Sequence, residues 1–124
     1  MNALKYKLSV SQAITPLLRT ASVNGTGLDL ANYLDNLVVF NPGAITDGTF
    51  TPKLQDSADN STWADVAAAD QVGTLSALAA NTMQSVSYIG SKRYIRAVIT
   101  ASGSPSTGGN MSATLVGKKR LQSP

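Results

Sequence analysis

Apolar and polar residues alternate with a period of two in several short stretches of this chain. The first ten residues place Leu4, Tyr6, Leu8 and Val10 on one side and polar residues on the other. Such alternation is typical of extended backbone, in which successive side chains point to opposite faces. We therefore expect residues 1–10 to form a first strand or an extended arm. Pro16 should interrupt any helix that follows.

Further strand patterns follow in the middle of the chain, each closed by turn residues. The β-branched run Leu37–Phe40 predicts a buried strand. Residues 49–55 alternate around Pro52, which predicts an edge or bulged strand because proline cannot donate to a ladder. Together with residues 62–66 they predict a hairpin. Asn24–Gly27 predicts a turn in which a positive φ is available at both glycines.

The clearest strand pattern lies in the second half. Residues 93–100 alternate, so Arg93 and Arg96 fall on opposite faces. We expect one of them to reach solvent or an interface, and the other to snorkel or to pair with an Asp. Residues 85–89 and 112–116 predict two more strands, with an exposed loop at Ser102–Asn110. Ala and Leu at residues 75–80 favour a short helix.

About seven or eight short strands, with turn signals every 8–12 residues, predict an all-β fold. We expect an antiparallel β-sandwich of jelly-roll type with an extended N-terminal arm, and the pattern leaves the strand order open. The absence of a βαβ pattern disfavours a parallel sheet. The 124 residues suit one domain. It divides into an N-terminal arm or first strand (1–22), a β-sandwich domain (23–117) and a basic C-terminal tail (118–124).

The composition removes most catalytic chemistry. The chain has no His, Cys or Glu, so seven Asp are its only acidic residues. This excludes Ser-His-Asp and Cys-His nucleophiles, disulfides and the usual zinc, haem and iron–sulfur sites. Residues 56–60 lack the spacing of a calcium loop and favour an Asx turn instead. We expect no enzyme, no catalytic residue, no metal site and no cofactor.

Positive charge is concentrated at the two ends of the chain. Six cations lie before residue 20 or after residue 117, whereas the body between holds four cations and all seven Asp. Because nucleic-acid binders gather cations on one face, separate basic ends favour an acidic protein surface as partner, or simply solvated ends. The candidate partner-binding residues are Lys5, Tyr6, Lys7, Leu8, Arg19, Lys118, Lys119 and Arg120.

Trp63 is the single tryptophan, and it lies on the predicted hairpin. There it could stack on a sugar or anchor an interface. A tryptophan in such a place more often caps a sandwich core, with its N–H bonded near the surface. We favour the core.

Two resemblances add to these predictions. The runs Gly25–Leu30, Asp47–Ser57, Trp63–Val66 and Tyr88–Arg96 resemble a family of small structural proteins of tailed bacteriophages. That resemblance implies a virion component, often of the head-decoration or cement kind, that clamps neighbouring major capsid subunits.

The second resemblance is local. Gln55, Ser57 and the run Asp59–Trp63, followed by Arg93–Arg96, are similar to the hairpin and strand of discoidin-like, galactose-binding jelly rolls. Those domains commonly have Asp-Gly where this chain has Asp59 and Asn60. This implies that Asn60 takes a positive φ. The likeness supports the fold more than it supports sugar binding.

Together these patterns predict a non-enzymatic phage capsid decoration protein on the capsid surface of the virion, made in the bacterial host cytoplasm. The expected partner is the major capsid protein, with self-association as a dimer or trimer, no membrane and no specific nucleic acid. Residues 1–10 would add a strand to a neighbouring subunit's sheet. The alternatives are a carbohydrate-binding jelly-roll module of a tail or host-recognition apparatus, or a neck or tail connector.

Overall fold

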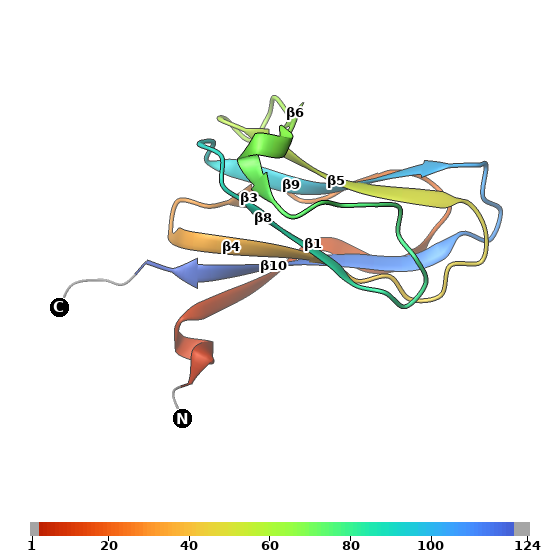
Figure 1. Cartoon of the computed structure of the whole chain (residues 1–124), viewed down its shortest axis with the longest axis horizontal. Coiled ribbons are helices and arrows are strands. Elements are labelled where there is room, and N and C mark those ends of the chain that lie inside the picture. Colours follow the sequence, from red (N-terminus) through yellow and green to blue (C-terminus); the bar gives the residue numbers. More distant parts are fainter. Residues whose placement is uncertain (1–2, 121–124) are drawn as a thin grey trace.

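Two antiparallel sheets pack face to face in the computed structural model, which describes residues 3–120 (Figure 1). The first sheet has, in spatial order, β1 (Leu8–Arg19), β10 (Gly109–Lys119), β4 (Tyr33–Phe40), β8 (Gln84–Tyr88) and β7 (Gln71–Val72). The second has β2 (Val23–Asn24), β9 (Tyr94–Ser102), β5 (Thr49–Ser57) and β6 (Ala64–Asp65), and β3 (Leu28–Asp29) also pairs with β9. Two 3-10 helices, η1 (Leu4–Tyr6) and η2 (Ala68–Asp70), precede β1 and β7. The predicted β-sandwich is confirmed, whereas its jelly-roll type stays a prediction.

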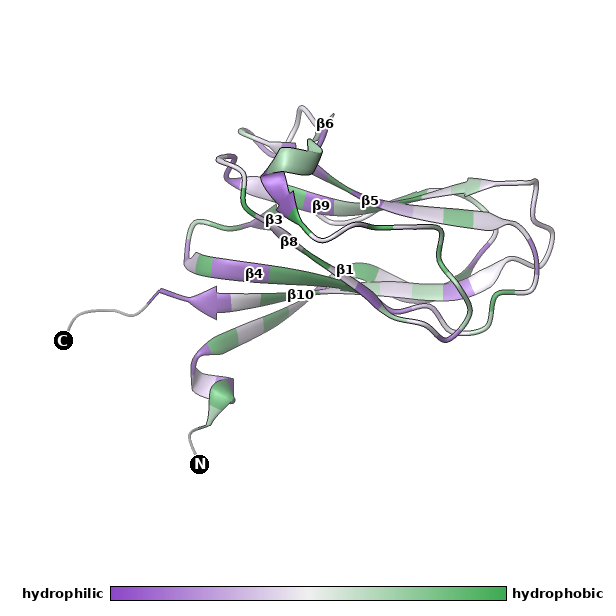
Figure 2. Cartoon of the chain, viewed as in Figure 1, coloured by the Kyte–Doolittle hydropathy of each residue, from purple (hydrophilic) through white to green (hydrophobic). Residues whose placement is uncertain are grey.

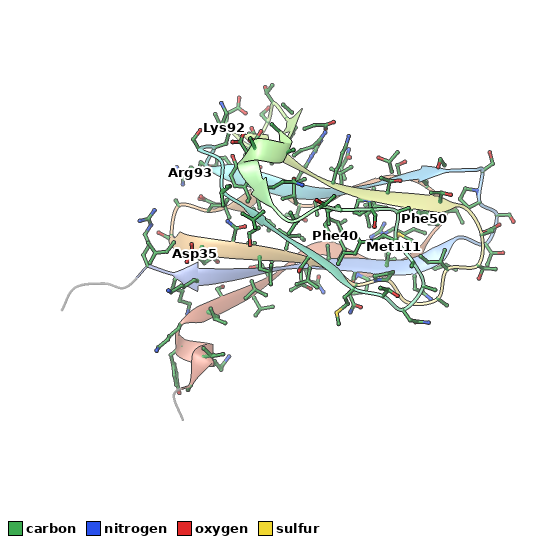
Figure 3. All side chains as sticks on the ribbon, viewed as in Figure 1. Asp35, Phe40, Phe50, Lys92, Arg93 and Met111 are labelled. Carbon is green, nitrogen blue, oxygen red and sulfur yellow. The ribbon has the colours of Figure 1, made fainter. Side chains whose placement is uncertain are left out.

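The core lies between the sheets because alternate residues of each strand point inward. Phe40 from β4 and Phe50 from β5 are fully buried and come from opposite sheets. Figure 3 shows both of them, with Met111 of β10, between the two layers. Burying such a side chain contributes roughly 1.5–3 kcal/mol to folding. The alternation seen in the sequence therefore supplies the packing that holds the sheets together.

The hairpin and edge predictions in the middle of the chain are confirmed. Gln55 pairs with Asp65, so β5 and β6 form the expected hairpin. β6 covers β5 only at residues 55 and 56, so Pro52 lies on a stretch with a strand on one side alone. The run 37–40 is buried only at Val38 and Phe40, since Leu37 points to the outer face of the sheet.

The ends of the chain belong to the first sheet. β1 starts at Leu8, so residues 8–10 of the expected arm are part of the sandwich. β10 continues to Lys119, and so Lys118 and Lys119 of the expected tail lie on a strand. The rest of that tail, residues 121–124, lies outside the described residues. Residues 8–19 and 109–119 therefore form two paired strands of the first sheet.

The helix expected at residues 75–80 is wrong. The segment has no helix and runs beside β5, where the Leu78 N–H donates to the Phe50 carbonyl at 2.8 Å. The Gln84 side chain bonds both the N–H and the carbonyl of Ser76, at 2.9 and 3.0 Å. Leu78 is buried against the core. These tertiary contacts outweigh the modest helix propensity of Ala and Leu.

Neither Gly25 nor Gly27 adopts the positive φ that is available to a glycine. Gly25 is required by a close approach instead. A Cβ there would lie 2.4 Å from the carbonyl oxygen of Ala13 in β1 and 2.6 Å from that of Ala97 in β9. Asn60 does adopt a positive φ, of 60°, which confirms the expectation for that turn.

Candidate interaction surface

The basic residues of the two chain ends come together at one end of the first sheet. Antiparallel pairing of β1 with β10 sets Leu8 opposite Lys118, and the Lys119 N–H donates to the Lys7 carbonyl at 2.9 Å. Figure 1 shows η1, in red, and the end of β10, in blue, at this end of the molecule. Lys5, Lys7, Lys118, Lys119 and Arg120 are all exposed there, and we call them the basic end. Seven of the eight candidate residues, all except Arg19, are part of this end of the ladder or close to it in sequence.

Arg120 is held against the sandwich although it follows the last strand. Its backbone N–H donates to the Asn32 carbonyl at 3.0 Å, and its Nε donates to the Ala31 carbonyl at 3.0 Å. These two bonds hold the backbone and the side chain of Arg120 against the segment just before β4. A cation held in this way loses less conformational freedom when it binds a partner.

Arg19 is separated from the other candidates. It ends β1, eleven residues beyond Leu8, which is roughly 35 Å along an extended strand. Its Nη2 donates to the Thr15 carbonyl at 2.8 Å. Arg19 is therefore not part of the basic end.

The outer face of the first sheet carries an apolar row beside the basic end. Val10, Val116 and Leu37 lie opposite one another on the adjacent strands β1, β10 and β4, and we call them the apolar row. Val10 is 70% exposed and Leu37 is 37% exposed. Leu4 and Tyr6 on η1 are also exposed, and Figure 2 shows hydrophobic bands along η1 and β1. Seven of the ten exposed large apolar side chains in the described residues belong to η1, β1 and β4.

A hollow of about 540 Å³ opens where η1 meets β1. Its walls are Leu4, Lys5, Lys119 and the three consecutive residues 8–10. Apolar side chains and two lysines therefore share one concave place at the start of β1. The sequence reasoning identified Leu8, Lys5 and Lys119 here, but it missed Val10, Val116 and Leu37. The alternation of residues 4–10 is a signal that could have identified Val10.

Trp63 lies on the outer side of the second sheet. It is half-buried and outside the core cluster, which corrects its interpretation as a core aromatic. The Arg96 guanidinium lies over the indole, with Cζ 4.6 Å from the ring centroid. The cation therefore covers one face of the ring.

Polar neighbours hold Arg96 in that position. Its Nε donates to Gln55 Oε1 at 2.8 Å, and Gln55 Nε2 donates to Asp65 Oδ1 at 2.9 Å. Lys53 Nζ lies 3.0 Å from the same carboxylate oxygen. The Gln55 hydrogen bond and Lys53 lower the pKa of Asp65. This group of side chains satisfies its own charges and hydrogen bonds.

Arg93 forms the expected pair with an Asp. Its Nε and Nη2 donate to the two carboxylate oxygens of Asp29 at 2.9 and 2.8 Å. This fork ties β3 to the start of β9, and it is the main cause that lowers the pKa of Asp29 to about 2. Figure 3 shows Arg93 at one end of the sandwich, near Lys92. Its role is structural.

The β5–β6 turn is the predicted Asx turn. Asp59 Oδ1 accepts hydrogen bonds from the Thr62 N–H at 2.8 Å, the Ser57 hydroxyl at 2.8 Å and the Ser61 N–H at 2.9 Å. These donors lower the pKa of Asp59 to about 2. Across residues 3–120, no three His, Cys, Asp or Glu side chains gather in a way that could hold a metal ion.

Tyr88 links the two sheets near a second cavity of about 510 Å³. Its hydroxyl donates to Asp56 Oδ2 at 2.8 Å and accepts the Lys92 N–H at 2.9 Å. Burial is the main cause that raises the pKa of Tyr88 to about 12. No local pattern predicts this contact, because Asp56 lies 32 residues away in the sequence.

Comparison with known proteins identifies the fold but no family. No known protein family matches the sequence, and no curated protein matches it. A solved structure with a similar fold is that of the PBSX exported protein XepA, with a TM-score of 0.53 and 19% identity. The match covers 94% of this chain and 39% of XepA, so the chain spans about two fifths of that protein. No helix within residues 3–120 is long and apolar enough to cross a bilayer.

Proposed function

We propose that this chain is a non-enzymatic structural protein of a tailed-phage virion that decorates the assembled shell of the major capsid protein. The observation that carries the proposal is the outer face of the first sheet, where the apolar row adjoins the basic end. A contiguous apolar patch with a charged rim is typical of a protein-binding surface. The rest of the described surface offers Asp side chains that are mostly bonded within the chain.

Two observations support a phage protein. The runs of sequence described above resemble small virion proteins, and the fold is similar to that of XepA, a phage PBSX protein, over 94% of this chain. The low identity makes the second observation a likeness of fold.

The physical mechanism would be contact area rather than chemistry. Burying the apolar row removes exposed Val and Leu from water, at roughly 25 cal/mol per Å². The basic end would speed the encounter with an acidic capsid surface. A phosphate backbone offers no apolar surface to this row, so an acidic protein suits the combination better than nucleic acid. Because the chain would bind only the assembled shell, it would stabilise that shell by mass action.

The carbohydrate-binding alternative would need Trp63 to stack on a sugar ring. Arg96 covers one face of the indole and is held there by Gln55, so at most the other face is available. A neck or tail connector differs from a decoration protein in its place, because it would form one ring in the particle rather than cover the shell. The decoration role therefore stands as the proposal.

The test is binding to expanded, undecorated capsids of the same phage. The purified chain should co-sediment with them and raise their temperature of thermal rupture. Val10→Asp should abolish both effects, whereas Val72→Asp should not, although Val72 on β7 is 60% exposed and thus comparable to Val10. Absence of binding, with an unchanged temperature of rupture, would refute the decoration role. If electron micrographs of intact particles labelled against this chain showed the label confined to one ring, the chain would be a connector.

A further inference from the structure

The first half of β1 is an unpaired sheet edge. Within residues 3–120, the strand that pairs with β1 is β10 alone, and β1 ends the sheet. The Lys119 N–H donates to the Lys7 carbonyl, so the alternation of an antiparallel ladder turns Ser9 and Ser11 toward β10. The N–H and carbonyl groups of Leu8, Val10 and Gln12 therefore point to the free edge.

This free edge lacks the usual protection of sheet edges. Proteins block exposed edges with proline, bulges or charged side chains. The second half of β1 has such features: the register shifts on both sides of Ile14, Pro16 follows, and the Thr26 N–H occupies the Ala13 carbonyl. Residues 8–12 contain no proline, no register shift and no charge. Five residues are thus available to another strand.

The cations around this edge favour an acidic segment as its binding partner. The hollow of about 540 Å³ runs along residues 8–10, and Lys5 and Lys119 line it beside Leu4. The basic end supplies five cations, and the acid aligned with it in the ladder is Asp35, opposite Lys118. A second copy of this chain paired at Val10 would bring further lysines and no acids. An acidic segment would neutralise the cations instead.

We propose that residues 8–12 of β1 accept an extended segment of a neighbouring virion subunit, which carries alternating apolar residues and acidic residues beside the basic end. The segment would continue the first sheet by one strand, as in other strand-addition complexes. This inference rests on the proposed function and specifies its partner. It reverses the expectation that residues 1–10 donate a strand, because β10 already holds residues 8–10 in this chain's own sheet.

Val10→Pro tests the hydrogen-bonding edge. Proline removes the N–H that points to the free edge and removes no bond to β10. Val10→Ala is the matched control, since it shortens the same side chain and keeps the N–H. We expect Val10→Pro to bind undecorated capsids at least about tenfold more weakly than Val10→Ala, with unchanged circular dichroism. Equal binding by the two variants, with the wild type bound, would overturn the inference and leave the decoration role intact.

A peptide titration tests the same edge without capsids. The probe is a seven-residue peptide that alternates valine and aspartate, and the control alternates valine and lysine. In NMR spectra of the wild-type chain, the aspartate peptide should shift the amides of residues 8–12, and added salt should weaken the effect. Shifts elsewhere, equal shifts with the lysine peptide, or no shifts would overturn the inference. Failure of the wild type to bind capsids, with the expected peptide shifts, would count against the decoration role alone.

A photo-crosslinker at Gln12 tests the occupant in assembled particles. The expected product joins Gln12 to an acidic, extended segment of another virion protein. This measurement also covers the case in which Val10→Pro does not fold. A product that joins two copies of this chain, or no product in decorated particles, would overturn the inference.

Discussion

Gly25 should not tolerate even a methyl group, because it lies between the two sheets. Its N–H donates to the Ala97 carbonyl of β9 at 2.7 Å, and the next residue, Thr26, donates to the Ala13 carbonyl of β1 at 3.0 Å. In Gly25→Ala, the added Cβ would lie 2.4 and 2.6 Å from those same carbonyl oxygens. Both obstacles are backbone atoms in strands, so neither can rotate away.

The expected cost follows from these contacts. Overpacking costs about 1–3 kcal/mol, and each of the two hydrogen bonds contributes about 0.5–1.5 kcal/mol. Gly25→Ala should therefore lower the free energy of unfolding by about 2–6 kcal/mol, a large part of the 5–15 kcal/mol typical of a domain. With a urea m-value of about 2 kcal/mol/M, the unfolding midpoint should fall by roughly 1–3 M.

Gly43→Ala is the matched control for this measurement. Gly43 also donates its N–H across the fold, to the Asn110 carbonyl at 2.8 Å, but a Cβ there would lie 3.4 Å from its nearest neighbour, Asn110 Cβ. We expect its unfolding free energy to stay within about 1 kcal/mol of the wild type. If Gly25→Ala also stays within that range, the close approach of the two sheets does not require glycine, and the reasoning is refuted.

Three further predictions concern polar contacts. The N–H donors of the turn hold the pKa of Asp59 at about 2, below its ordinary 3.8, so its contribution to stability is present above about pH 4 and is lost as the pH falls toward 2. Urea unfolding between pH 2 and 5 should show a smaller pH dependence for Asp59→Asn than for the wild type; equal slopes would contradict this. Tyr88→Phe should cost about 1–3 kcal/mol, because it leaves the Lys92 N–H and Asp56 without their shared partner. The raised pKa of Tyr88, about 12, also implies that the wild type loses stability as the pH rises from 10 toward 12, a loss that unfolding of Tyr88→Phe should not show. Arg96→Ala should cost less than about 1 kcal/mol in thermal unfolding and should change the fluorescence of Trp63, whereas unchanged emission would argue against the stacked pair.

Local patterns predicted the strands well because alternation is itself a local property. Residues 49–55 and 93–100 alternate, and both lie in strands of the second sheet. The predictions are wrong where a residue's conformation or burial depends on contacts with residues far away in the sequence. Residues 75–80 form no helix, and the Leu78 N–H bonds the Phe50 carbonyl, 28 residues earlier. Trp63 lies outside the core cluster, in contact with Arg96 of β9.

At the candidate interaction surface, too, local patterns identified the residues but did not predict which of them lie together. The sequence identified the basic residues at both ends, yet it treated the ends as separate, since no local pattern states that β1 pairs with β10. That pairing joins residues more than a hundred positions apart, Leu8 with Lys118 among them. It also aligns Val10, Val116 and Leu37 into one row.

Composition and alternation by themselves determined that this chain is a β protein without His, Cys or Glu. The residue types present limit its chemistry, and the period of two favours extended backbone. Only the tertiary structure decided which strands are neighbours, and therefore which charges meet, which apolar side chains stay exposed and which edge of the sheet is free. The physical reason is that strand pairing is a contact between distant segments, whose choice depends on the packing of the whole core.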